Sequence, residues 1–207
     1  MMRSIIPKIS DRIRHYRLKK RCTPQDSTVR FAKGCKIKLN MGGGKNQIVI
    51  GKNSRIYGCI IVCASGKVTL GQHVAIGPNT RVMAVNNVTI GDYTETGPDV
   101  TICDNNNHPV NPADRMVMRF TPAGAKERSW IYSSNAPVVI GKNVWIGEHA
   151  RICKGVTIGD GSVIAANSVV TKDVPALSIA AGNPAKIVKE NIDQAPRFFA
   201  DKQDEKF

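Results

Sequence analysis

One histidine of this sequence lies in a setting that suits acid–base chemistry. His108 follows the Asp/Asn-rich residues 104–107 and precedes a segment that contains several prolines. An imidazole titrates near neutral pH, so it can remove the proton of a hydroxyl group and make its oxygen a nucleophile. The other histidines suit this role less well, because His15 belongs to a basic stretch and His73 and His149 occupy outward-facing repeat positions where we expect solvation. His108 is therefore a candidate catalytic base.

A six-residue repeat must position this histidine. From Val138 to Val174 an aliphatic residue recurs every six positions, and a small or β-branched residue follows four places later. The two sets are Ile140, Ile146, Ile152, Ile158, Ile164 and Val170, and Val144, Ala150, Val156, Ser162, Ser168 and Val174. A period of six fits neither a helix nor an alternating strand, but it fits a β-solenoid with three flat sides. We expect the aliphatic side chains to point inward and to stack on their equivalents one coil away.

The same pattern continues before Val138, with one interruption. The earlier sets are Ile50, Ile56 and Val62, then Leu70, Ile76 and Val82, then Ile90, Thr96 and Ile102, of which Thr96 breaks the aliphatic rule. The sets begin twenty residues apart, which predicts coils of three hexads plus two residues. The repeat resumes about thirty residues late, so a loop at about 103–137 is inserted. Its prolines and Asp/Asn-rich turns cannot continue the coil. Such a long loop is usually functional, and folded over a flat face it would form a cleft beside His108.

The chain divides into three predicted parts. Residues 1–28 form a basic amphipathic N-terminal helical segment, residues 29–186 the β-helix domain with its loop, and residues 187–207 a charged C-terminal segment. The apolar residues of the helix recur at three- and four-residue spacing and are Ile5, Ile6, Ile9, Ile13 and Tyr16. We expect this helix to cap the end of the solenoid. A peripheral contact with anionic lipid or with a polyanionic acceptor is the alternative.

Composition narrows the function classes. The net charge of +14 would suit nucleic acid, an anionic membrane surface or an acidic substrate, but no recognition helix, zinc finger or aromatic RNA-binding motif accompanies it. No run of about 18 apolar residues and no signal peptide is present. We therefore expect a cytoplasmic protein without nucleic acid, with a peripheral position at the inner membrane face as a variant. The 6 cysteines include no C-x-x-C pair, so we expect reduced thiols and no metal.

Several motifs make the sequence similar to one family. They are the hexads, the loop start Asn107-His108-Pro109-x-x-Pro112, and the segments 143–147, 159–164, 170–175 and 181–186. Together they resemble the left-handed β-helix acetyltransferases with hexapeptide repeats, in the branch of galactoside, maltose and capsular-polysaccharide O-acetyltransferases. The resemblance implies an all-β solenoid, namely a left-handed parallel β-helix with a protruding loop and short helical ends. It also implies a homotrimer with acetyl-CoA bound in a groove between adjacent prisms.

The resemblance assigns roles to individual residues. His108 matches the catalytic histidine, and Asn79 matches a sugar-binding asparagine. The positions matched to coenzyme A binding are Gly147, Ala166, Thr171, Lys172 and Lys186, and Trp145 is predicted to wall the acceptor or thioester site. Asn107, Arg115 and Trp145 are further predicted acceptor contacts. The partner that orients His108 stays open between Asp104, Asn107, Glu127 and a main-chain carbonyl.

The acceptor is expected to differ from galactoside or maltose. The acidic sugar ligand of those enzymes is missing, since residues 84–87 read Ala-Val-Asn-Asn. Basic residues surround the expected cleft instead, namely Arg81, Arg115, Arg119, Lys126 and Arg128. We therefore predict an acetyl-CoA-dependent O-acetyltransferase acting on an anionic or large glycan, such as a capsular or lipopolysaccharide sugar.

Three alternatives stay open at this point. The first is an amino-sugar N-acetyltransferase, and the second is a non-catalytic, polyanion-binding solenoid. The third is a γ-class carbonic anhydrase, which uses the same solenoid but needs three histidines around zinc. Only His73, His108 and His149 could supply them, and the close pair of ligands expected on one coil is missing.

Overall fold

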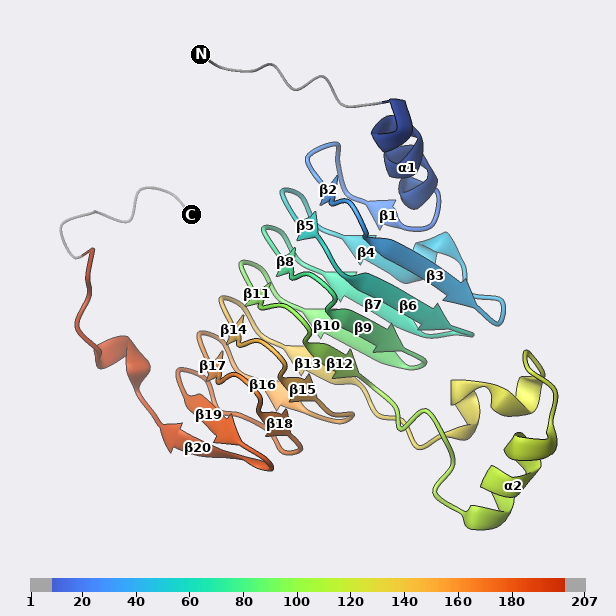
Figure 1. Cartoon of the computed structure of the whole chain (residues 1–207). Helices are drawn as coiled ribbons and strands as arrows, with labels where there is room; N and C mark the ends of the chain where they lie inside the picture. The colour runs from blue at the N-terminus through green and yellow to red at the C-terminus, as the bar shows by residue number, and fades with distance from the viewer. Residues whose placement is uncertain (1–8, 200–207) are drawn as a thin grey trace.

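A computed structural model of the chain describes residues 9–199, with side chains from residue 13 onward. Its centre is a prism in which short parallel strands alternate between three sheets (Figure 1). The first sheet contains β1 (Thr23–Pro24), β4 (Ile48–Ile50), β7 (Lys67–Leu70), β10 (Asn87–Ile90), β13 (Val138–Ile140) and β16 (Thr157–Ile158). The second contains β2 (Arg30–Phe31), β5 (Arg55–Ile56), β8 (Ala75–Ile76), β11 (Glu95–Thr96), β14 (Trp145–Ile146), β17 (Val163–Ile164), β19 (Ile179–Gly182) and β20 (Ala185–Lys189). The third contains β3 (Lys36–Asn40), β6 (Cys59–Cys63), β9 (Arg81–Ala84), β12 (Thr101–Cys103), β15 (Arg151–Ile152) and β18 (Val169–Val170).

The interior of the prism is built from the six-residue repeat. Ile140, Ile146 and Ile152 are at most 1 % exposed, and their small partners Val144 and Ala150 are buried beside them. Each leading residue pairs with its equivalent on the next coil, as Ile146 does with Ile164. Burying one such side chain contributes about 1.5–3 kcal/mol, so the stack is the main source of stability. The predicted inward positions of the hexads are therefore confirmed.

Thr96 occupies an interior position without loss of a hydrogen bond. It is buried, and its Oγ1 accepts a hydrogen bond of 2.9 Å from the backbone N–H of Gly77 one coil away. A buried hydroxyl that is satisfied in this way avoids most of the cost of desolvation. The departure from the aliphatic rule is thus accommodated by the corner of the neighbouring coil.

The alignment on the third sheet differs from the prediction. Val62 pairs with Ala84, while Val82 pairs with Ile60, so Val62 is not the equivalent of Val82. The reason is a shortened corner at Gly58, where Cys59 donates a 2.7 Å hydrogen bond to the carbonyl of Thr80. A Cβ at Gly58 would clash with that carbonyl, so only glycine allows this close approach. The uniform coil of three hexads plus two residues is therefore wrong for this coil.

Helix α1 (Ile9–Lys19) lies at the N-terminal end of the prism (Figure 1). Its buried side chain is Leu18, and the ring of His15 packs edge-on against Phe31 at 5.1 Å. Ile13 and Tyr16, predicted for the apolar face, are 47 % and 61 % exposed. The side of the helix that meets the prism is therefore the one that carries Leu18 and His15, not the predicted face with Ile13 and Tyr16. Ile5 and Ile6 lie outside the described residues.

The two ends of the solenoid differ from the predicted part boundaries. Strand β1 already pairs with β4 of the first sheet, ahead of residue 29. At the other end β19 and β20 form an antiparallel hairpin that runs across residue 186, followed by the short 3₁₀ helix η4 (Ile192–Gln194). Within the described residues, no helix combines the length and apolarity needed to cross a bilayer.

Candidate active site

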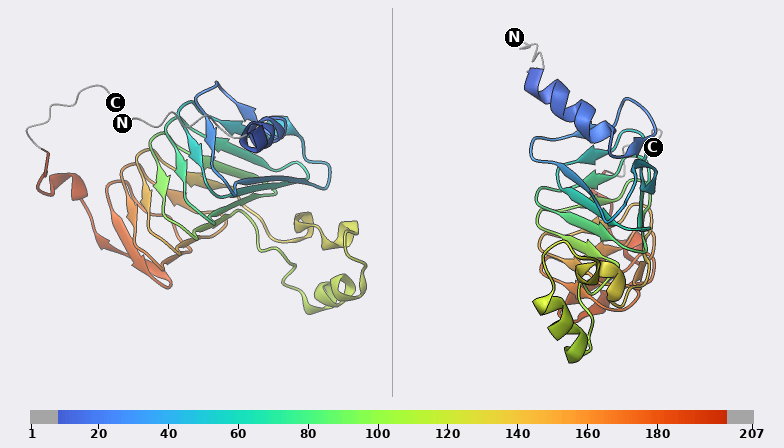
Figure 2. Two further views of the ribbon diagram at one scale, coloured as in Figure 1. Left: turned by 45° about the horizontal axis from the view of Figure 1, so that its top comes forward. Right: turned by 90° about the vertical axis from the view of Figure 1, so that its right-hand side faces the viewer.

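The inserted loop leaves the prism after β12 and returns at β13, and it projects beside the third sheet (Figures 1 and 2). It contains α2 (Pro112–Phe120) and the 3₁₀ turns η2 (Lys126–Arg128) and η3 (Trp130–Tyr132). Asn111 begins α2, because its side chain accepts a 2.8 Å hydrogen bond from the N–H of Ala113. Proline at the first helical position cannot donate a hydrogen bond, and none is needed there.

Asp104 anchors the start of the loop. Its side chain is 0 % exposed, and its carboxylate accepts hydrogen bonds from the backbone N–H groups of Val85 at 3.0 Å and Asn86 at 2.7 Å. The side-chain amide of Asn105 donates a further bond of 2.9 Å. Hydrogen bonds to a charged acceptor are about twice as strong as neutral ones. Asp104 is therefore occupied with positioning the chain that leads to His108.

A small apolar cluster holds the far side of the loop against the prism. Ile61, Met83 and Cys103 are buried on the outer surface of the third sheet, with Cys59 and Trp130 packed against them. Trp130 belongs to the loop, so its indole covers side chains that would otherwise face water. This second core explains why the loop has a defined place over the sheet.

The main chain around His108 is fixed while its imidazole is not. The N–H of His108 donates to the carbonyl of Asn106 at 2.8 Å, and the N–H of Asn107 donates to Asn105 Oδ1 at 2.9 Å. Asn107 has a φ of 63°, a left-handed conformation that asparagine tolerates well. Within the described part of the chain the exposed imidazole makes no hydrogen bond, and the buried Oδ1 of Asn107 has no partner. The imidazole is therefore accessible to a ligand, whereas Oδ1 of Asn107 is a buried acceptor.

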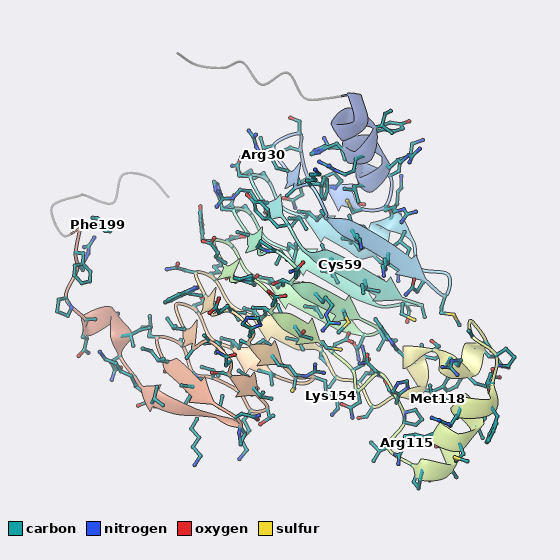
Figure 3. The ribbon with its side chains drawn as sticks, viewed as in Figure 1. Arg30, Cys59, Arg115, Met118, Lys154 and Phe199 are labelled. Carbon is teal, nitrogen blue, oxygen red and sulfur yellow. The ribbon has the colours of Figure 1, made fainter. Side chains whose placement is uncertain are left out.

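His108 borders a cavity of about 580 Å³ on the outer surface of the third sheet. Asn79 and Asn107, both predicted to contact the acceptor, line the same cavity. The remaining lining residues are Gly34, Lys36, Lys38, Tyr57, Gly58, Cys59, Ile61, Arg81, Met83, Trp130 and Arg151. Tyr57 and Gly58 form the shortened corner described above, so this corner closes one end of the cavity. Figure 3 shows Cys59 on the outer surface of the sheet.

A second cavity of about 760 Å³ lies on the other side of His108. It belongs to the loop and contains Arg115, which was predicted to contact the acceptor; Figure 3 shows Arg115 and Met118 there. The other lining residues are Pro112, Met116, Met118, Arg119 and Arg128. Arg128 donates a 2.6 Å hydrogen bond to the carbonyl of Met118, which ties η2 to α2.

The residues matched to coenzyme A lie away from the lining of both cavities. Gly147 and Ala166 follow β14 and β17 at one corner of the prism, and a Cβ at Gly147 would lie 2.6 Å from the N of Ala166. Coil stacking alone therefore requires glycine at this position. Thr171 and Lys172 are exposed at the next corner, after β18.

The other two predicted residues lie on the second sheet. Trp145 is on β14 and 61 % exposed, and Lys186 is on β20. The described chain thus brings together His108, Asn79, Asn107 and Arg115, but not the residues predicted for the donor.

The other histidines lie at corners of the prism. His73 stacks on Tyr93 at 5.1 Å, and its Nε2 is 3.0 Å from Nδ2 of Asn53, so it is more engaged than a solvated residue. His149 is exposed beyond β14. Among residues 13–199 no three His, Cys, Asp or Glu side chains gather as a metal site requires. These histidines do not form the set that a zinc-dependent carbonic anhydrase needs.

Comparisons with known proteins agree with this architecture. The family model described as bacterial transferase hexapeptide (six repeats) matches residues 137–172. These residues carry the hexapeptide repeat of that family. Relatives of Staphylococcus aureus with acetyltransferase in their names are 45 % identical over 75 residues, which is 36 % of this chain and 38 % of theirs. The galactoside O-acetyltransferase of Escherichia coli is 51 % identical over 63 residues, 30 % of this chain and 31 % of that protein. The chain therefore spans about two fifths or less of the length of these relatives.

Solved structures extend the likeness in fold over most of the chain. The N-acyltransferase AntD of Bacillus cereus, in complex with dTDP and 3-hydroxybutyryl-CoA, has a TM-score of 0.64 at 19 % identity, covering 86 % of this chain and 87 % of that one. A maltose O-acetyltransferase of Clostridium difficile has a TM-score of 0.55 at 23 % identity, covering 91 % and 79 %. At these identities the likeness establishes the fold. The predicted left-handed parallel β-helix is confirmed.

Several cavity residues escaped the sequence analysis. Lys36, Lys38, Arg151, Tyr57 and Trp130 line the cavity of His108 but were not among the predicted site residues. The cations lie on the third strand of successive coils, which a sequence can indicate. Their alignment with one another could not be predicted, because it depends on the register that Gly58 sets. Trp130 carried no signal, because its position follows from the path of the loop.

Proposed function

We propose that this protein is an acetyl-CoA-dependent O-acetyltransferase, which acetylates a sugar hydroxyl in a capsular or other cell-surface polysaccharide. The observation that carries the proposal is His108, whose imidazole has no hydrogen-bond partner in the described chain and faces a cavity also lined by Asn79 and Asn107. Support for the reaction class comes from the acetyltransferase names of the relatives that share the repeat.

The chemistry assigned to His108 is general base catalysis. Its imidazole takes the proton of the acceptor hydroxyl as the oxygen attacks the thioester carbonyl of acetyl-CoA, so a C–O bond forms and the C–S bond breaks. The same proton then passes to the departing thiolate. General base catalysis of this kind contributes about 10²- to 10⁴-fold to the rate. A backbone N–H would stabilise the oxyanion.

The donor is proposed to bind with residues of more than one copy. Gly147 and Ala166 lie at one prism corner, Thr171 and Lys172 at the next, and the two corners cannot both face one His108 in a single chain. A homotrimer, as implied by the resemblance, would place the corner of a neighbouring copy beside the loop. Small residues at a corner let an extended pantetheine arm lie along the backbone, and Lys172 or Lys186 would meet its phosphates.

The cellular location is also a proposal. We expect a cytoplasmic enzyme, with the basic helix α1 as a peripheral contact at the inner membrane face. Its exposed cations near the end of the helix are Arg17, Lys20 and Arg21.

The test is a thiol-release assay with acetyl-CoA and a panel of monosaccharides, nucleotide sugars and capsular oligosaccharides. His108→Ala should lower kcat/KM by about 10²- to 10⁴-fold with an unchanged melting temperature, because the side chain is exposed. His73→Asn is the matched control, since it lies outside both cavities and asparagine tolerates the φ of 56°. Full activity of the His108→Ala variant would remove the proposal.

The product distinguishes the alternatives. An ester that mild base hydrolyses identifies O-acetylation, whereas a base-stable amide identifies an amino-sugar N-acetyltransferase. The fold of the N-acyltransferase AntD makes this comparison necessary. Absence of thiol release with every acceptor would favour a non-catalytic, polyanion-binding solenoid.

A further inference from the structure

The outer surface of the third sheet carries an aligned row of cations. Lys36 pairs with Cys59, Cys59 with Arg81, Arg81 with Thr101, and Thr101 with Arg151. Neighbouring strands lie about 4.8 Å apart, so Lys36, Arg81 and Arg151 follow one another at intervals of about 10 Å. Lys38 lies two residues beyond Lys36 on the same side of β3. We call Lys36, Lys38, Arg81 and Arg151 the cationic row.

The charges of the cationic row are not neutralised by the described chain. No Asp or Glu is among the described residues that line the cavity, and none of the four cations forms an ion pair there. Among the described residues, the side chains of the row make one hydrogen bond, of 3.3 Å, from Nη2 of Arg81 to Oγ1 of Thr101. Like charges held together repel one another, so an anion placed among them would be stabilised.

The pKa of the Cys59 thiol is affected by three of these cations. Burial raises the pKa of the Cys59 thiol, while the nearby charges of Lys38, Lys36 and Arg81 act in the opposite direction. Three members of the cationic row therefore act on one sulfur atom that lines the cavity, as expected from the strand register.

Among the described residues, neither of the other two sheets has cations spaced along its whole outer face in this way. One outward row of the first sheet is Val49, Thr69, Thr89, Val139 and Thr157, which are all neutral, and the outward Lys67 pairs with the neutral Asn87. Those of the second are Arg30, Arg55, Ala75, Glu95, Trp145 and Val163, where two adjacent cations are followed by an acid and by neutral residues. The cations are aligned on the face to which the loop brings His108.

The same cavity offers the other contacts that a saccharide needs. Tyr57 and Trp130 provide aromatic surface for the apolar face of a sugar ring, and Asn79 and Asn107 provide amides for its hydroxyls. His108 and the cationic row border this one cavity of about 580 Å³, so a single molecule can contact both. Such a volume accommodates a saccharide of one or two residues.

We infer that the acceptor is an anionic saccharide, whose carboxylate or phosphate group binds the cationic row while one of its hydroxyls reaches His108. The inference rests on the proposed function and adds the chemical class of the acceptor. It predicts that charge on the acceptor, rather than its ring stereochemistry alone, governs recognition. Carboxylate and phosphate are both suitable anions for arginine, so the test includes each source.

The experiment compares matched acceptors with the full-length protein. Galacturonate against galactose and digalacturonate against galactobiose form the carboxylate arm, and glucose 1-phosphate against glucose forms the phosphate arm. Thiol release gives kcat/KM, and isothermal calorimetry without acetyl-CoA gives Kd independently of turnover. We expect at least one charged acceptor to exceed its neutral partner by about tenfold or more, with a KM that rises with added NaCl.

Variants locate the effect. Arg81→Gln should raise the KM and Kd of the charged acceptor by about 10- to 100-fold and leave those of its neutral partner within about twofold. Arg55→Gln is the control, because Arg55 is an exposed cation at the outward position of β5 on the second sheet.

The outcomes separate the inference from the function. Equal kcat/KM and Kd for charged and neutral acceptors, unchanged by Arg81→Gln, would overturn the anionic acceptor while acetyl transfer stands. Charge-dependent binding that Arg81→Gln removes, without thiol release for any acceptor, would support the anion site and overturn the proposed enzyme.

Discussion

The prism and the inserted loop hold their side chains in different ways. In the prism Ile146 lies between Thr96 of the coil before and Ile164 of the coil after, and the same arrangement recurs along the solenoid. In the loop, the contacts of Asp104 and of Trp130 are each made once. A repeated contact places a residue by register, whereas a unique contact places it by its own partners. The candidate site lies at the junction of the prism and the inserted loop, so it depends on both kinds of contact.

This difference has a consequence for function. The prism supplies a rigid wall with the cationic row, and the loop supplies His108 at its edge. The loop also carries Met116, Val117 and Phe120 as exposed apolar side chains on α2. Substitutions in each region should therefore affect different properties, and the following variants test that separation.

The largest change in stability is expected from Ile146→Ala in the prism. Removing a fully buried Ile side chain leaves a cavity and should lower the free energy of unfolding by about 2–5 kcal/mol. Urea denaturation measures the change. Val139→Ala on the outward side of β13 is the control and should cost under about 1 kcal/mol, since Val139 is exposed. Similar losses for both variants would contradict the repeat as the source of stability.

A smaller loss is expected from Asp104→Asn at the start of the loop. The amide puts an NH₂ donor where the carboxylate accepts from Val85 and Asn86, at a cost of about 1–3 kcal/mol. Hydrogen exchange should speed up at these two backbone amides, and acetyl transfer should fall because His108 loses its support. Asp173→Asn is the control, because Asp173 is exposed and accepts one bond from the N–H of Thr157. Unchanged exchange in Asp104→Asn would show that the loop does not depend on this anchor.

Trp130→Ala should release the loop with little effect on the prism. The half-buried indole contributes about 1–2 kcal/mol through its contacts with Ile61, Met83 and Cys103. Limited proteolysis should cut within residues 104–136 faster than in the wild type. Trp145→Ala is a matched control, since this tryptophan is 61 % exposed on β14. Equal cleavage of the two variants would mean that the second cluster does not hold the loop.

The smallest expected effect concerns His15 at the end of the prism. Burial is the main cause that lowers its pKa below 6.5 in the folded protein. As the pH falls through the unfolded value, the unfolded chain binds the proton first, so stability is lost between that pH and the folded pKa. His15→Gln should therefore lose less stability than the wild type between about pH 7 and pH 5 in urea titrations. Parallel pH profiles of the two proteins would rule out this contribution.

The pattern of apolar residues predicted more of the prism than of the site. The inward hexad positions, the three flat sides and the place of the insertion all follow from a period of six, because each inward residue needs an apolar neighbour above and below. The setting of His108 at the start of the insertion already made it a candidate base, and the resemblance added the hand of the coil and the match of Asn79 to a sugar-binding residue. Asp104 was considered as a partner of His108, but its carboxylate is used by the backbone of Val85 and Asn86.

What the sequence by itself determined is the interior of this protein, since six-residue spacing specifies which side chains stack regardless of how each corner is turned. Only the tertiary structure decided which outward side chains of neighbouring strands lie next to one another. Gly58 shortens one corner, which shifts β6 against β9 and brings Lys36, Cys59 and Arg81 into line. Corner length depends on how closely two backbones can approach, and the path of the loop depends on contacts such as that of Trp130 with Met83. Neither property is encoded in a periodic pattern, so the cavity of His108 could be described only after the coils were closed in three dimensions.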